Sequence, residues 1–201
     1  AIEPVSVATK WFDYLGTHDE MYGDGRLEIS IPEFPDVTFR WYPEKMEAVT
    51  EEKINPLYTG MPIWNTYFCD LTGDGLPELC STLSIGSGMI DNRVIIYDYA
   101  NGASYSLEDR GVFDYTLWQN GSDGQLYVDK SNHIGGDVVA SGKLVFQDEC
   151  IQMVVQSVHH DAILEIINPT DDPNFAYDTA VEKIYEDEVN EYFIGGLYSQ
   201  H

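Results

Sequence analysis

Through most of the chain, apolar and polar residues alternate with a period of two. This is the spacing of a β-strand that buries one of its faces. Turn residues separate the alternating segments, as at Asn101-Gly102, residues 120–124 and Ser141-Gly142. The alternation predicts strands at Arg26–Ile31, Val37–Tyr42, Ile63–Asp70, Glu78–Ile85, Arg93–Tyr99, Ala103–Leu107, Phe113–Gln119, Gln125–Asp129, Lys143–Gln147, Ile151–Ser157 and Ala162–Ile167.

The two ends of the chain have a different, helical periodicity. In residues 4–15 the apolar side chains fall on one helical face, and Pro4 suits a first helical turn. Near the other end, Thr179 and Glu182 form a capping box, and apolar residues follow at helical spacing until Gly195. The pattern therefore predicts an N-terminal and a C-terminal helix.

Short strands joined by short turns imply antiparallel meanders, because parallel strands need long crossover connections. We therefore predict a mainly β protein of the α+β class, with antiparallel β meanders between the two helices. A length of 201 residues fits a single domain. Prolines cluster in residues 1–62, which is typical of a looser subdomain or an edge ribbon. No internal sequence repeat is evident, which argues against a complete β-propeller formed by this chain alone.

The charge of the chain excludes two classes of partner. Ten Lys and Arg against 35 Asp and Glu give a formal net charge of −25. Such a chain repels nucleic-acid phosphates and anionic membrane surfaces. No run of about 18 apolar residues is present, so we expect no membrane insertion of this segment. A surplus of carboxylates suits solubility and hard cations that bind through oxygen.

One segment places oxygen-bearing residues at the spacing of a calcium loop. Counted from Asp70, they occupy positions 1, 3, 5 and 9, and Gly75 at position 6 permits a sharp turn. An ordinary Asx-type turn is the alternative, but three carboxylates within nine residues repel one another unless a cation offsets them. The segment therefore predicts one structural Ca²⁺. Its expected ligands are the side chains of Asp70, Thr72 and Asp74, the carbonyl of Leu76, and Glu78 directly or through water.

This 70–78 loop differs from an EF-hand, because position 12 is Ser81 and both flanks are strand-like. It resembles the strand–loop–strand calcium sites of FG-GAP and VCBS-type repeats, which follow the pattern Asp-x-Asn/Asp-x-Asp-Gly-x-x-Asp. Thr72 and Glu78 are its departures from that pattern.

A second resemblance covers about Leu27 to Val128 and rests on Gly60–Asn65, Tyr67–Thr82, Tyr97–Gly102 and Asp109–Gly111. This part of the chain looks like the extracytoplasmic C-terminal region of BlaR/MecR-type antirepressor proteins of Gram-positive gut bacteria, which are integral-membrane metallopeptidases. The resemblance implies an extracytoplasmic module, secreted or at the cell surface, that is tethered to a membrane peptidase with a signalling role. The peptidase motif H-E-x-x-H is absent from these 201 residues.

Together these features predict a non-catalytic sensor or interaction module with one structural calcium site and a protein, peptide or cell-wall glycan ligand. The alternative is a hydrolase or binding module that acts on cell-wall or glycan material through an aromatic-lined acidic cleft. A structural or adhesive domain is a third reading, and an exposed aromatic patch opposite the 70–78 loop would favour it.

Two smaller features leave alternatives open. Cys69 and Cys80 are either bridged across a hairpin or buried as free thiols. The pair His159-His160 is expected to lie at a strand end or in a turn, since adjacent strand residues point to opposite faces and do not readily share a metal.

Overall fold

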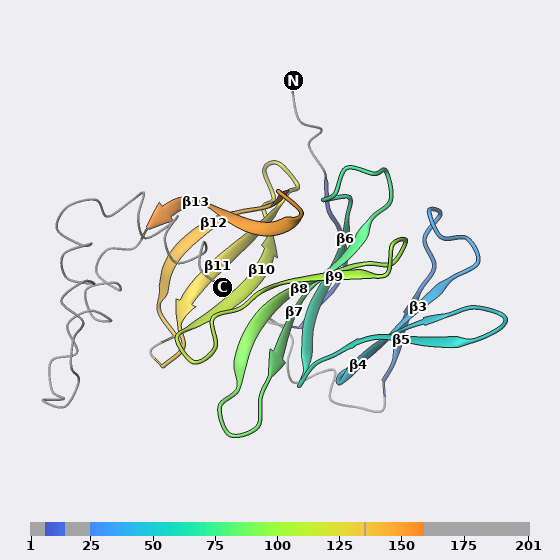
Figure 1. Ribbon diagram of the computed structural model, residues 1–201, viewed down its shortest axis with the longest axis horizontal. Coiled ribbons are helices and arrows are strands. Elements are labelled where there is room, and N and C mark those ends of the chain that lie inside the picture. The colour runs from blue at the N-terminus through green and yellow to red at the C-terminus, as the bar shows by residue number, and fades with distance from the viewer. Residues whose placement is uncertain (1–6, 15–24, 135, 159–201) are drawn as a thin grey trace, which may run out of the picture.

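The computed structural model describes residues 7–14, 25–134 and 136–158, and the structural statements below concern these residues. Within these ranges the regular structure is entirely β. Thirteen strands form three antiparallel sheets that lie as layers across the molecule (Figure 1). The prediction of a mainly β protein with antiparallel meanders is confirmed.

The central sheet has the strand order β1-β6-β7-β8-β9. Its middle strand is buried almost throughout, from Glu78 to Ser84, because neighbouring sheets cover both of its faces. The strands of the central sheet are β1 (Thr9–Asp13), β6 (Ile63–Cys69), β7 (Glu78–Ile85), β8 (Asp91–Asp98) and β9 (Ala103–Leu107).

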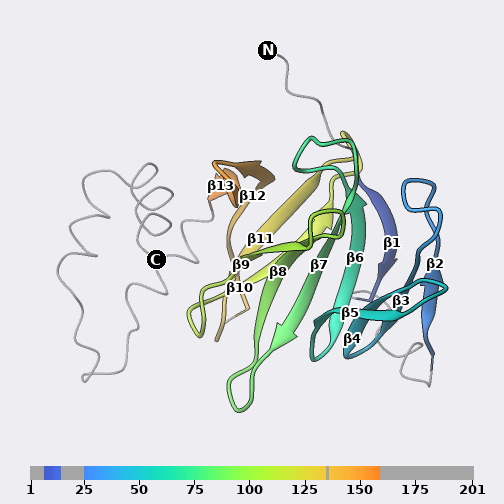
Figure 2. The same ribbon diagram turned by 45° about the vertical axis from the view of Figure 1, so that its right-hand side comes forward.

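A four-stranded meander flanks the central sheet on each side, and each meander follows the order of the chain (Figure 2). The meander repeats in the structure although no repeat is evident in the sequence. The first flanking sheet contains β2 (Leu27–Ile29), β3 (Thr38–Tyr42), β4 (Lys45–Val49) and β5 (Ile54–Thr59). The second contains β10 (Phe113–Gln119), β11 (Leu126–Asn132), β12 (Val138–Gln147) and β13 (Cys150–Val158).

Two hydrophobic cores hold the three layers together. Leu79 and Leu83 of β7 belong to the core between the central sheet and the β2–β5 sheet, which includes the fully buried Trp41. The intervening residue Cys80 belongs to the other core, with Tyr115 from the β10–β13 sheet. The alternation of a strand therefore supplies both cores at once.

Buried polar groups join the central sheet to β10, the edge strand of its neighbour. The side-chain amide of Asn65 donates to the carbonyl of Leu117 over 2.7 Å, and its oxygen accepts from the main-chain N–H of Thr82 over 2.8 Å. The main-chain N–H of Leu117 donates to the hydroxyl of Thr82 over 2.8 Å. Backbone groups at the edge of β10 are thus paired by side chains from the adjacent layer.

The structure corrects the prediction of an N-terminal helix over residues 4–15, because Thr9–Asp13 form strand β1. The pairing of β1 with β6 shifts between Lys10 and Phe12. This irregularity leaves Trp11 and Phe12 packed in the same core, so apolar residues recur at a spacing that mimics a helix. The expected C-terminal helix and the strand Ala162–Ile167 lie outside the described residues.

Further differences concern strands and turns. The strands β1, β4 and β5 were not predicted, and β5 contains Pro56 at a sheet edge. Ser141-Gly142 is not a turn but lies within β12, where a Cβ on Gly142 would approach the carbonyl oxygen of Val154 to 2.4 Å.

No helix among the described residues is long and apolar enough to cross a membrane.

Candidate metal centre

The 70–78 loop connects β6 to β7, and the hairpin fixes the positions of its two ends. Asp70 follows the last residue of β6, and Glu78 is the first residue of β7. Cys69 and Glu78 are register partners in the antiparallel ladder. Leu71 packs against the core beneath the loop. The two ends of the loop, each with a carboxylate, therefore lie side by side.

Three of the five predicted ligands converge. One carboxylate oxygen from each of Asp70, Asp74 and Glu78 lies within 4.8 Å of the other two. Glu78 is buried, Asp70 is half-buried and Asp74 is exposed, so the group opens from the protein interior to solvent. Oxygen ligands of a single Ca²⁺ lie at about 2.3–2.6 Å from the ion, so two of them are separated by at most about twice that distance. Separations of up to 4.8 Å are therefore compatible with one shared ion.

Glu78 is held in position by the loop it closes. Its Oε2 accepts a hydrogen bond from the N–H of Leu71 over 2.7 Å, and its Oε1 accepts one from the hydroxyl of Thr72 over 2.7 Å. Burial raises the pKa of Glu78, and these hydrogen bonds oppose the rise. The site therefore contains a carboxylate whose charge is poorly solvated, which is the condition that a bound cation relieves.

Asp70 organises the turn itself. Its two carboxylate oxygens accept hydrogen bonds from the N–H groups of Gly73 over 2.7 Å and of Gly75 over 3.0 Å. Gly75 has a φ of 88°, a conformation that favours glycine, so its predicted role in the sharp turn is confirmed. Asp74 accepts from the N–H of Leu76 over 2.8 Å. These Asx-type bonds are shared by a plain turn and by a calcium loop.

The other two predicted ligands have different positions in the loop. The Thr72 hydroxyl contacts Glu78 as a donor, which leaves the lone pairs of its oxygen for other contacts. Leu76 is joined to Asp74 through its main-chain N–H. Asp70, Asp74 and Glu78 are the carboxylates that could hold an ion together, and the Thr72 hydroxyl adjoins them through its contact with Glu78.

The structure adds a neighbour that the sequence did not indicate. The side-chain amide of Asn101, in the turn between β8 and β9, lies 3.5 Å from Oδ2 of Asp74. The same amide donates to the buried Asp98 over 2.8 Å. In the sequence, Asn101 indicated only a turn before Gly102. Its contact with Asp74 could not be predicted, because it depends on β7 and β8 being adjacent strands.

The two cysteines beside the loop are not bridged. Cys69 and Cys80 are both buried, and neither forms a disulfide. Burial raises the pKa of the Cys80 thiol, which keeps it protonated and unreactive. Of the two alternatives that the sequence left open, buried thiols without a bridge are therefore the one observed. His159 and His160 lie outside the described residues.

Comparisons with protein-family models, with curated proteins and with solved structures give no match to this chain. The function proposed next therefore rests on the geometry of the described residues and on the sequence.

Proposed function

We propose that this chain is a non-catalytic interaction or sensor module whose 70–78 loop binds one structural Ca²⁺. The observation that carries the proposal is the convergence of oxygens from Asp70, Asp74 and Glu78 within 4.8 Å. Flexible loops of carboxylates and carbonyls suit Ca²⁺, whereas Mg²⁺ demands a near-ideal octahedron and retains much of its water. The ion neutralises charge at the buried end of the site and joins the end of β6 to the start of β7.

The role assigned to the ion is structural. Its ligands come from one short loop at the end of a hairpin, and a hairpin end gains stability when a cation offsets the repulsion of its carboxylates. Extracellular calcium modules bind with dissociation constants of about 0.1–1 mM. Binding in that range at 10 mM Ca²⁺ stabilises the folded state by about 1–3 kcal/mol.

Thermal unfolding with and without calcium tests this proposal. The chelator-treated protein should gain about 3–10 °C in melting temperature at 10 mM Ca²⁺, and much less at equal Mg²⁺. Asp74→Asn should remove most of the gain, because it deletes one of the three charges. Asp36→Asn, at an exposed turn between β2 and β3, is the matched control and should respond like the wild type. An unchanged melting temperature in the wild type at 10 mM Ca²⁺ would refute the calcium proposal.

The BlaR/MecR resemblance extends the proposal to location and association. On this reading the chain lies outside the cytoplasm, tethered to a membrane metallopeptidase of the antirepressor class, and takes part in signal transduction. Millimolar calcium is available outside cells, which agrees with the affinity expected of such a loop. Protease treatment of intact cells tests the location, since an extracytoplasmic module is cleaved while cytoplasmic proteins are spared.

A further inference from the structure

Exposed apolar side chains gather at the end of the molecule opposite the 70–78 loop. The loop precedes β7 at Glu78, whereas β7 ends at the exposed Ile85, at the other end of the strand (Figure 1). The described residues include nine exposed large hydrophobic side chains, and six of them belong to this group. We call the group the apolar end; it consists of Met61, Ile85, Met89, Ile90, Val112 and Ile134.

Contacts between the loops make the apolar end one surface. The main-chain N–H of Met61 donates to the carbonyl of Ser84 over 2.7 Å, which places Met61 beside the end of β7. The sulfur of Met89 lies only 2.7 Å from the position that a Cβ on Gly111 would occupy. The N–H of His133 donates to the carbonyl of Val112 over 3.2 Å.

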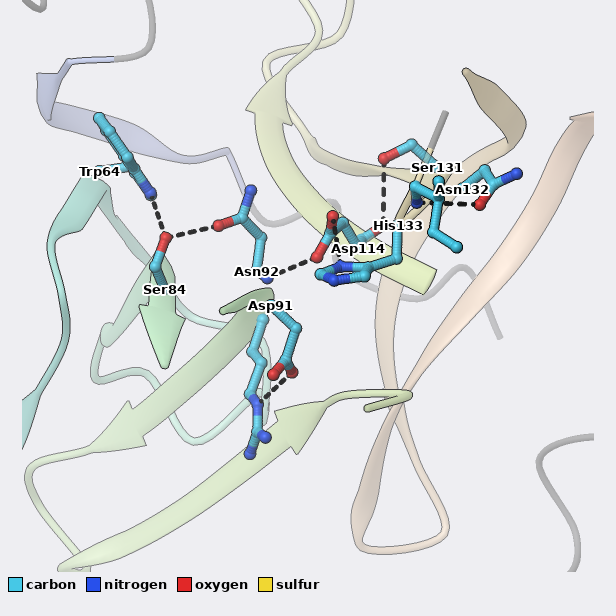
Figure 3. A network of polar contacts seen from close by, with 10 residues as sticks. Trp64, Ser84, Asp91, Asn92, Asp114, Ser131, Asn132 and His133 are labelled. Atoms are coloured by element: carbon cyan, nitrogen blue, oxygen red, sulfur yellow. Dashed lines mark hydrogen bonds and ion pairs between the residues drawn. The ribbon is translucent and has the colours of Figure 1, made fainter. Parts of the chain in front are cut away.

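A network of hydrogen bonds joins residues that are close in sequence to the apolar end (Figure 3). The indole N–H of Trp64 donates to Ser84 over 2.7 Å, and the Ser84 hydroxyl donates to Asn92 over 2.6 Å. The N–H of Asn92 donates to Asp114 over 2.6 Å, and the other oxygen of Asp114 lies 3.1 Å from Nδ1 of His133. The network crosses from the central sheet to the β10–β13 sheet. It joins β7, β8 and β10, the strands that border these loops, and a preorganised support of this kind lowers the entropic cost of binding.

The charges around the apolar end are mostly negative. Glu44 and Asp137 are exposed at its margin, where their carbonyls accept hydrogen bonds from the N–H groups of Gly60 and Asn132, and Arg110 is an exposed base nearby. Glu108 is also exposed but is already paired with Arg93. The whole chain carries a formal net charge of −25, so its field attracts a cationic partner and repels a second copy of itself.

We propose that the apolar end is the docking surface for a basic, amphipathic polypeptide segment. Its methionines adapt to varied apolar side chains, while the acidic margin pairs with Lys and Arg of the segment. Six exposed apolar residues on a fixed platform are typical of an interaction site. The inference gives a partner to the interaction role proposed above, and it does not depend on the ion.

A fluorescent peptide composed of leucine and lysine in an amphipathic pattern is a suitable probe, with a peptide of leucine and glutamate as its counterpart. We expect saturable binding of the lysine peptide that weakens with salt, and none of the glutamate peptide. The double variant Met89→Gln with Ile134→Gln should weaken binding about tenfold. Ile54→Gln with Val154→Gln removes two exposed apolar residues elsewhere on the protein and should change binding little.

Several outcomes would overturn the docking proposal. Wild-type affinity in both double variants would mean that binding follows net charge and does not use the apolar end. Binding to phosphatidylcholine vesicles, with none to the peptide, would assign the surface to lipid. A concentration-dependent dimer that only the Met89/Ile134 variant abolishes would make it a contact between copies. Asp74→Asn separates the two proposals, because it should impair calcium binding and leave peptide binding intact.

Discussion

At the scale of single residues, Glu78 couples the fold to the proposed ion. Its carboxylate is buried and its pKa is raised, so the ionised form weakens the folded state at neutral pH when no cation is present. The same charge becomes favourable once a cation lies beside it.

Glu78→Gln separates these two effects, because it keeps the shape of the side chain and removes the charge. Without divalent cations, we expect the free energy of unfolding at pH 7 to change by less than about 1 kcal/mol. With 10 mM Ca²⁺, the wild type should gain stability and the variant should not. Urea denaturation measures the free energy of unfolding under both conditions. Equal calcium gains in the two proteins would show that Glu78 is not a ligand.

Lys130 gives a pH-dependent prediction. It is buried, its Nζ lies 3.8 Å from the centre of the Phe113 ring, and burial lowers its pKa from 10.5 to about 8. Between these two values the unfolded state binds more protons than the folded state, so this residue makes stability rise with pH. A shift from 10.5 to about 8 corresponds to an effect of up to roughly 3 kcal/mol.

Lys130→Met isolates this contribution. We expect the stability of the variant relative to the wild type to be highest below pH 8 and to decline steadily toward pH 10.5. The raised pKa values of Tyr58, Tyr67 and Cys80 act in both proteins and cancel in the difference. Urea denaturation at several pH values measures the difference in free energy of unfolding between the variant and the wild type, with exposed Lys53→Met as the control. If that difference did not change with pH, the lowered pKa of Lys130 would be contradicted.

At the scale of elements, the layers are joined by hydrogen bonds as well as by apolar packing. Asn65→Ala leaves the carbonyl of Leu117 and the N–H of Thr82 without their buried partner. We expect a loss of about 2–4 kcal/mol in the free energy of unfolding. Asn55→Ala, on the edge strand β5, should change it by less than about 0.5 kcal/mol. A loss below about 1 kcal/mol for Asn65→Ala would mean that water replaces the side chain.

Sequence patterns predicted elements where the local signal is regular. Glu78–Ile85, Ala103–Leu107 and Phe113–Gln119 were predicted with the observed bounds, because turn residues flank a clear alternation. β1 was missed because its irregular pairing breaks the period of two, and β5 because Pro56 is atypical of a strand.

The same distinction applies to the two proposed sites. The 70–78 loop was predictable because its carboxylates are close in sequence and the loop spacing brings them together. Asn101 and the apolar end were not predictable from the sequence, because their contacts join loops that are distant in the chain. An exposed aromatic patch was the feature expected of an adhesive domain, whereas the exposed residues found opposite the loop are aliphatic or methionine.

At the scale of the whole molecule, the two proposed sites lie at opposite ends of β7. The acidic loop at one end is suited to an ion and the apolar surface at the other to a polypeptide. The formal net charge of −25 favours both, since it attracts calcium and a basic segment alike. The layered scaffold thus keeps the proposed ion site and the proposed partner surface apart.

Isothermal titration calorimetry of the chelator-treated protein with Ca²⁺ tests the central claim most directly. We predict saturation at one ion per chain with a dissociation constant of about 0.1–1 mM, and loss of the heat signal in Asp74→Asn and Glu78→Gln. Asp36→Asn should titrate like the wild type. Absence of saturable heat in the wild type, or an undiminished signal in both loop variants, would contradict a calcium site at Asp70, Asp74 and Glu78.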